Sequence, residues 1–543
     1  MRPKPPAVEK PMPVFLLGFD EAANIYDNID PDDCQRREYR RAALWHVFRG
    51  ARDHPVWAVF LSRNSKIEAF ASSLDGDPSA RVVSRKLRRE YPFMALEVDL
   101  EYEHRLRASL DIMDVSIADF VSVDNMTSFG RPLWRLCADM SFPEMRSFIQ
   151  KYMLSGAAAR LDQNDIKQVF AILASRVCLD PCLNNAGGIQ LFRDVVDSHL
   201  RLLIALKPPS ALRTATPSEP VVAEAAAAIL AQGATGGSPM DTWSNCIQVL
   251  TDRLLRCGLV DKGTKGELVA RLLFVLARDS LSLQMVAPNT DFPFSRPFKV
   301  ADFLDHMFGH GVVDQLVEQS LPPSRRSVSN WDPVHDFRAG VCNFSHFART
   351  LNPLPSNRAK FENLLMILLR RNAALQLAPL QENWDIHLPF YTSNINLPID
   401  HSHLSAIFVR VKNRQMGPNL VLGPGYNAYH HGKQLGICVQ MELSMEPGPS
   451  QAIIRLGTPS EPVIFGMTAK GCSLDKYPFL GCHPGLISGC DTLLRTVLLE
   501  EPSAVEAGAV EKLECPQANS LPMSRYDGYT GGRQPPVVGG ASG

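Results

Sequence analysis

The sequence predicts an α/β protein in three parts: a short parallel sheet, a helical middle region and a C-terminal α/β module. Two apolar runs, Val14–Phe19 and Val56–Leu61, flank the helix-like segment Gln35–Ala51 and indicate a strand–helix–strand unit with parallel strands. Between residues 105 and 280, apolar residues recur at spacings of three and four, as in helices. After residue 290, a strong helix pattern precedes several strand-like runs.

Length and composition set the broad class. The chain has 543 residues, 45% hydrophobic and 21% charged, which allows sizeable cores and argues against global disorder. The net charge of −1 gives no overall electrostatic footprint for nucleic acid, although a local basic groove is compatible with it. The sequence lacks a long apolar run and an apolar leader, so we expect no membrane span and no secretory signal. Twelve scattered cysteines suggest reduced thiols in a cytoplasmic or nuclear protein.

Composition along the chain suggests five segments. We expect disorder in residues 1–13 and 502–543, a strand–helix–strand core in 14–104, a helical region in 105–290 and the α/β module in 291–501. The helices expected in the middle region are Phe142–Leu154, Asp162–Val177, Gly188–Leu206, Pro220–Ala231, Thr242–Cys257 and Lys265–Asp279, with a linker at Pro208–Pro220. In the last module we expect helices Val300–Phe308, Arg358–Ala374 and Asp491–Glu500 and strands Trp384–Tyr391, Ala406–Lys412, Gly436–Leu443, Ala452–Leu456 and Val463–Met467.

The first apolar run ends on two adjacent acids, Asp20 and Glu21. In a P-loop NTPase, a buried parallel strand delivers such carboxylates to the sheet edge, where one helps to hold Mg²⁺ and the other orients the attacking water. Asn64, after the next strand, is a candidate sensor of the γ-phosphate, and Arg81 is a candidate phosphate or interface contact. Strands that end in acids are also common without a nucleotide, because strands must exit into solvent.

The glycine-rich phosphate loop that a nucleotide needs is missing before these acids. That loop requires the pattern G-x-x-x-x-G-K-[ST], whose glycines let the backbone approach the phosphates and whose lysine contacts them. We therefore predict a partial P-loop-type core and do not expect ATP binding or hydrolysis by this sequence.

A second constellation resembles a metal-dependent nuclease. Restriction-endonuclease-type sites use a carboxylate on one strand, an acid-x-Lys triplet on the next and often a glutamate on the preceding helix. Here Asp385 and Glu362 are the candidate Mg²⁺ ligands, and Lys412 is the candidate water-activating group. Arg410 stands where the triplet needs a ligand, and a guanidinium repels a cation. The alternative is a sheet edge protected by outward Arg410 and Lys412.

Together these segments resemble a family of long proteins in basidiomycete fungi that pair a P-loop NTPase with a restriction-endonuclease-like domain, similar to Crinkler-type effectors and related toxin-like proteins. In that family the triplet segment typically reads I-x-I-Q-V-K-N. The segments that carry the resemblance are LLGFDEA at 16–22, VFLSRNSKIEAFA at 59–71, DPSARV at 77–82, VCNFSHFART at 341–350, NWDIHLPFY at 383–391 and AIFVRVKNR at 406–414.

The resemblance implies an N-terminally truncated or degenerate relative that binds nucleic acid or a protein partner with little catalysis. Two alternatives stay open: a working metal-dependent DNA nuclease, and a non-enzymatic protein that docks partners through its helical region. A gene-model fragment of an ATPase is a further explanation of the missing loop. A zinc site at Cys472, Cys482, His483 and Cys490 is not expected, because these residues lack a CxxC pair.

Overall fold

The computed structural model describes most of the chain after residue 97 and short pieces before it. The described residues are 15–19, 47, 56–60, 98–107, 115–156, 160–182, 186–207, 211–232, 239–261, 265–285, 290–320, 332–350, 353–355, 357–378, 381, 383–412, 435–443, 452–456, 463–481 and 483–495. They form a mixed α/β protein, as the sequence predicts, and the chain divides into two compact units, which are treated separately below.

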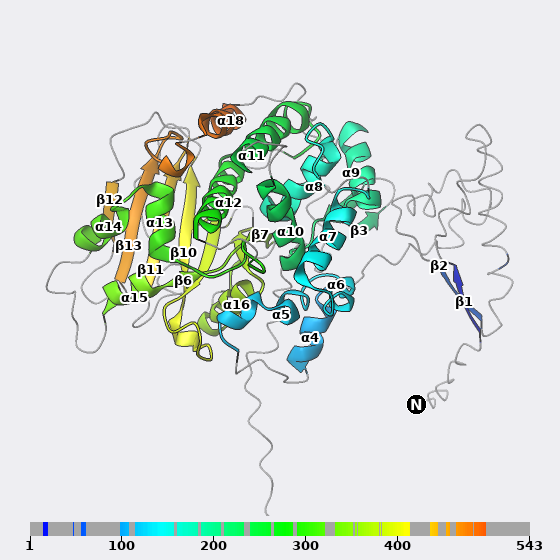
Figure 1. The fold of residues 1–543 in the computed structure, drawn as a ribbon, viewed down its shortest axis with the longest axis horizontal. Helices are drawn as coiled ribbons and strands as arrows, with labels where there is room; N and C mark the ends of the chain where they lie inside the picture. The colour runs from blue at the N-terminus through cyan, green and yellow to red at the C-terminus, as the bar shows by residue number, and fades with distance from the viewer. Residues whose placement is uncertain are drawn as a thin grey trace, which may run out of the picture. The chain divides into compact units, whose positions relative to one another are not determined.

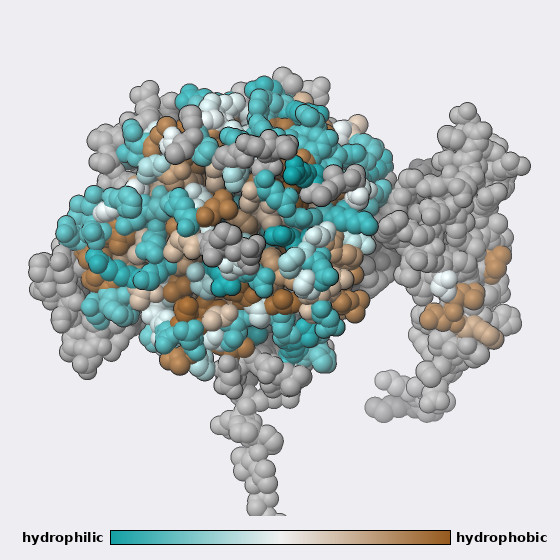
Figure 2. All heavy atoms as spheres, viewed as in Figure 1, coloured by the Kyte–Doolittle hydropathy of each residue, from teal (hydrophilic) through white to brown (hydrophobic). Residues whose placement is uncertain are grey.

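The first unit contains a pair of parallel strands. β1 (Phe15–Phe19) and β2 (Val56–Phe60) run in register, with Phe15 opposite Val56 (Figure 1). This pairing confirms the two parallel strands that the apolar runs predict. Phe15, Leu16 and Leu17 of β1 are exposed, Leu16 by 70%. A hydrophobic area appears at this strand in Figure 2. Two strands alone bury little apolar surface.

A second pair of strands replaces a predicted helix end and linker. Helix α9 (Ala186–Ser198) stops well before the predicted Leu206, and Leu200 has a left-handed backbone with φ of 59°. The apolar run that follows forms β3 (Leu202–Lys207), which pairs with β4 (Ala211–Ala215). The prediction was wrong here because periodicity cannot separate a short apolar strand from a helix turn.

The second unit holds most of the helices, and several begin or end where the sequence predicts. α10 and α13 match the predicted bounds at both ends, whereas α8 begins four residues late because Asp165 caps it by accepting from the Lys167 amide. The described helical segments are α4 (Leu100–Arg107), η3 (Ala118–Val121), α5 (Val123–Met126), α6 (Pro132–Leu136), α7 (Phe142–Met153), α8 (Ile166–Val177), α10 (Pro220–Ala231), α11 (Pro239–Val249), η4 (Leu250–Leu255), α12 (Lys265–Met285), α13 (Val300–Phe308), α14 (Val312–Ser320), α15 (Pro333–Ala339), α16 (Arg358–Arg370), η6 (His401–His403), η7 (Pro478–Leu480) and α18 (Pro484–Arg495).

A mixed sheet lies in the same unit. Its order is β12-β13-β11-β10-β9-β6-β5, with β8 pairing both β9 and β7. Strands β10, β11 and β13 are parallel, β9 is antiparallel to β10, and β12 is antiparallel to β13. The strands are β5 (Phe298–Lys299), β6 (Val341–Cys342), β7 (His346–Arg349), β8 (Ala373–Gln376), β9 (Ile386–Tyr391), β10 (Leu404–Lys412), β11 (Leu435–Glu442), β12 (Ala452–Leu456) and β13 (Val463–Lys470).

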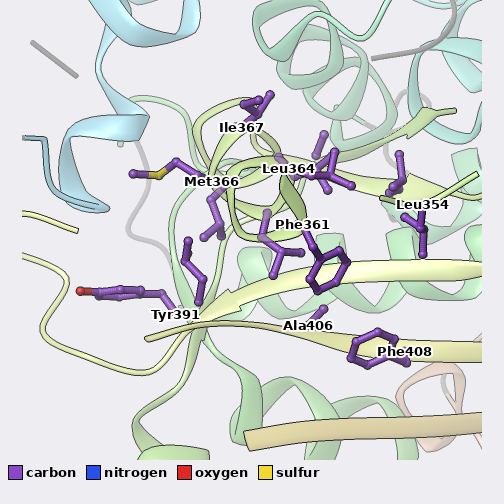
Figure 3. Packing of buried hydrophobic residues seen from close by; sticks show 14 of the residues in the cluster. Leu354, Phe361, Leu364, Met366, Ile367, Tyr391, Ala406 and Phe408 are labelled. Carbon is purple, nitrogen blue, oxygen red and sulfur yellow. The ribbon is translucent and has the colours of Figure 1, made fainter. Parts of the chain in front are cut away.

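Helix α16 covers one face of this sheet. The Asn357 side chain caps it by accepting from the Lys360 amide, and Asn372, at φ of 51°, follows its end. Its buried Phe361 lies 6.3 Å from Phe408 of β10, centroid to centroid. Figure 3 shows both side chains within the packed cluster. The opposite sheet face meets α15, where Phe337 stacks on a β13 phenylalanine. The faces of β9, β10, β11 and β13 can therefore be assigned by alternation.

A buried ion pair fastens the helices to one another. Arg176 of α8 donates to both carboxylate oxygens of Asp279 on α12, at 2.6 and 3.2 Å, and both residues are almost fully buried. The same guanidinium donates to the backbone oxygen of Ser345, just before β7. One side chain therefore joins two helices to the edge of the sheet.

Candidate functional site

The apolar face under α16 becomes polar at one end of the sheet. Phe408 and Cys438, paired across β10 and β11, belong to the core cluster. Two residues later on the same strands, Arg410 lies opposite Gln440. These strands are parallel, so the change takes place at their carboxyl ends, where open α/β sheets commonly bind ligands.

Seven residues share this end and this face, and we call them the carboxyl-end row. Strand alternation and the pairing register place them in two lines across the strands, in which Gln440 faces Thr468 and Glu442 faces Lys470 across β11 and β13. Neighbouring strands are about 5 Å apart, so each residue is within side-chain reach of the next. The members of the row are Asp385, Arg410, Lys412, Gln440, Glu442, Thr468 and Lys470.

Asp385 is fixed to strand β10 by two hydrogen bonds. Its amide donates to the Val409 carbonyl at 2.9 Å, and its carboxylate oxygen Oδ2 accepts from the Val411 amide at 2.6 Å. Burial raises the pKa of Asp385 to about 6, with a smaller rise from Glu267 of α12, while the Val411 hydrogen bond and Arg410 act to lower it. This carboxyl group is therefore mainly protonated below about pH 6 and mainly ionised above it.

The structure thus brings Asp385 against strand β10, which carries the second predicted site residue, Lys412. Asp385 precedes β9 and bonds to the β10 backbone between Arg410 and Lys412, which is the neighbourhood that the carboxylate and triplet pattern requires. Arg410 is half-buried and lies within electrostatic range of Asp385.

The third predicted residue, Glu362, has a partner on its own helix. Its carboxylate accepts from the Arg358 side chain at 2.6 Å, one helical turn earlier on α16. A cation at Glu362 would compete with this ion pair. We therefore assign Glu362 to the support of α16 rather than to the row.

The charges of the row are mostly positive. Arg410, Lys412 and Lys470 are the three basic members, and Glu442 and Asp385 are the two acidic ones. The row therefore attracts anions at neutral pH, with one carboxylate placed between two lysines.

Gln440 and Glu442 are the buried members of the row on β11. Gln440 is 1% exposed, and its side-chain amide nitrogen donates to Glu442 Oε1 at 2.5 Å. The amide oxygen of Gln440 is buried without a hydrogen-bond partner in the described part of the chain. Sequence reasoning missed both residues, since the alternation in Gly436–Leu443 shows a strand but not which strand it neighbours.

The nucleotide-type candidates cannot be placed. Asp20, Glu21, Asn64 and Arg81 all lie outside the described residues, although β1 and β2 end close before the first three. The candidate nucleotide-site roles of these residues, and the expectation that the chain does not bind ATP, stay predictions.

Other site types find little support within the described ranges. Groups of three or more His, Cys, Asp or Glu suited to a metal are absent there, and Cys482 of the rejected zinc set is not described. An open hollow of about 550 Å³ lies along α6 and α7 and contains none of the predicted site residues. Within the same ranges, every helix is too short or too polar to span a bilayer.

No family model, curated protein or solved structure matches this chain. Inference about its function therefore depends on the geometry of the row.

Proposed function

We propose that the carboxyl-end row binds the phosphodiester backbone of nucleic acid, and that it is a restriction-endonuclease-like site with little or no hydrolytic activity. The observation that carries this proposal is the hydrogen bond of Asp385 to strand β10 beside Arg410 and Lys412. This bond sets the carboxylate beside the two basic side chains, which supports the comparison with such nucleases although Arg410 departs from their pattern.

Electrostatics support an anionic ligand. Arg410 and Lys412 are half-buried at the end of β10. The effective dielectric constant there is lower than in water, so the two cations attract an anion more strongly than fully exposed cations do. Phosphate contacts from such side chains supply most sequence-independent affinity for nucleic acid. The net charge of −1 for the chain does not oppose this, because the cations are local.

Efficient hydrolysis is disfavoured by the same residues. Arg410 carries no lone pair for a cation, burial of Asp385 disfavours its charged form, and Glu362 is paired with Arg358. The ligands that the nuclease pattern expects are thus reduced to a single weak one. The proposal includes that the chain is a relative of Crinkler-type proteins with a partial P-loop core.

The test is binding of a fluorescein-labelled DNA oligonucleotide to the full chain, measured by anisotropy in EDTA. We expect Lys412→Gln and Arg410→Gln each to weaken binding about fivefold to tenfold and to lower the salt dependence by about one counterion. Arg495→Gln is the matched control, since Arg495 is an exposed cation paired with Asp491 on α18.

Two results would overturn the proposal. One is wild-type protein that does not bind single-stranded or double-stranded DNA or RNA at low salt. The other is an unchanged affinity in both row variants while Arg495→Gln weakens binding. Cleavage assays with Mg²⁺ or Mn²⁺ then separate a binding-only row from a working nuclease, with Asp385→Ala as the inactive reference.

A further inference from the structure

Glu442 has an unusual position for a site that binds phosphates. It is 8% exposed and lies in register between Lys412 and Lys470, in the middle of the cationic row. A phosphate drawn to these lysines would meet the carboxylate at close range, and like charges repel most strongly where water is scarce. A cation between the carboxylate and the phosphate removes this conflict.

Gln440 supplies a second oxygen at the same place. Its amide oxygen is buried and lacks a hydrogen-bond partner among the described residues, and an unsatisfied buried acceptor destabilises a fold. Its amide nitrogen is held by Glu442 at 2.5 Å, which fixes the nitrogen and oxygen assignment because the reverse would set oxygen against a carboxylate. The amide oxygen is therefore an acceptor whose lone pairs remain available to a ligand.

Carboxylate and amide oxygens are the ligands that Mg²⁺ and Mn²⁺ prefer, and Mg²⁺ is commonly held by one or two carboxylates together with substrate phosphates and waters. Arg410 and Lys412 lie opposite Gln440 and Glu442, one strand away. The oxygen ligands missing at the triplet on β10 are thus present at the same level on β11.

We propose that Gln440 and Glu442 form the protein half of a divalent-cation site, which a phosphate oxygen of the bound nucleic acid completes. This inference rests on the proposed function. Only one of the two ligands is a carboxylate, so the site agrees with the absence of a three-member His, Cys, Asp or Glu group in the described ranges. Lys412 and Lys470 then hold the phosphate on either side of the cation.

The experiment measures Mn²⁺ binding to the full chain by the loss of the free-ion electron paramagnetic resonance signal, with and without a DNA oligonucleotide. We expect the oligonucleotide to tighten Mn²⁺ binding at least tenfold in the wild type and not in Glu442→Gln. Gln440→Met should weaken Mn²⁺ binding, whereas Gln440→Glu, which adds a charged ligand, should strengthen it. Asp491→Asn is the control for loss of an exposed carboxylate.

The opposite effects of the two Gln440 variants keep the test valid if Glu442→Gln folds poorly. If a buried water rather than a cation bonds to Gln440 and Glu442, all variants should bind Mn²⁺ equally. That result overturns the cation site. DNA binding that is lost in Lys412→Gln but indifferent to Mn²⁺ leaves the proposed function standing and removes this inference. Mn²⁺ binding at Gln440 and Glu442 without any DNA binding removes the proposed function instead.

Discussion

Replacing Asp385 by Asn tests the electrostatics at the centre of the row. Asn keeps the size of the side chain and an oxygen that accepts from the Val411 amide, but it cannot ionise. The substitution therefore isolates the cost of a carboxylate charge that burial makes unfavourable.

The magnitude follows from the shift in pKa. The pKa of Asp385 rises from 3.8 to about 6, and each unit is worth 1.36 kcal/mol, which gives at most about 3 kcal/mol. The folded state holds the proton more tightly than the unfolded state, so stability falls as pH rises from about 4 to about 6. The penalty is absent below this window and complete above it.

The assay is urea unfolding of wild type and Asp385→Asn from about pH 4 to pH 8, followed by tryptophan fluorescence. The variant should equal the wild type near pH 4 and exceed it by as much as about 3 kcal/mol above pH 7. Asp400→Asn is the control of opposite sign, because hydrogen bonds from Ser402 lower the pKa of Asp400. A stability difference for Asp385→Asn that does not change with pH would refute this reasoning.

Two further predictions concern the frame that holds the row. Asp279→Ala leaves Arg176 charged and unpaired in the interior and should cost about 3–5 kcal/mol of unfolding free energy in urea, whereas the double variant Arg176→Met with Asp279→Leu should lose much less. Equal losses in the two proteins would contradict this. Gly130→Ala, at φ of 88°, drives a methyl group into Glu219, so it should lower the melting temperature more than Gly156→Ala, whose φ of 78° brings only about 1–2 kcal/mol of backbone strain. The reverse ranking would show that the contact with Glu219 relaxes freely.

The sequence predicted best those elements whose ends have local chemical causes. Pro220 at the first turn of α10 and the strand β12, Ala452–Leu456, agree with the expected bounds. The helix predicted for Arg358–Ala374 stops early, because Asn372 takes a left-handed backbone and the residues after it pair as β8. That ending depends on a neighbouring strand, which no local pattern reveals.

The candidate site divides in the same way. Asp385 and Lys412 were predicted because their spacing follows a known two-strand pattern within one stretch of chain. Gln440 and Glu442 were missed because their meaning depends on β11 pairing with β10 in parallel, across residues 413–434. Glu362 on α16 was predicted as a metal ligand, and only the structure shows that its carboxylate forms an ion pair with Arg358.

Arg410 is better explained by a rearranged site than by simple decay. A neutral loss of the ligand at this position would leave β11 free to carry apolar residues at its buried positions, as it does at Cys438. Instead Gln440 and Glu442 keep costly polar groups at 1% and 8% exposure, directly opposite Arg410 and Lys412. The two side chains are hydrogen-bonded to each other, but the amide oxygen of Gln440 has no partner among the described residues, and such a group reduces stability. Its presence in the same row favours the proposed role in ligand binding, in which Arg410 would contact the phosphate and β11 would hold the cation.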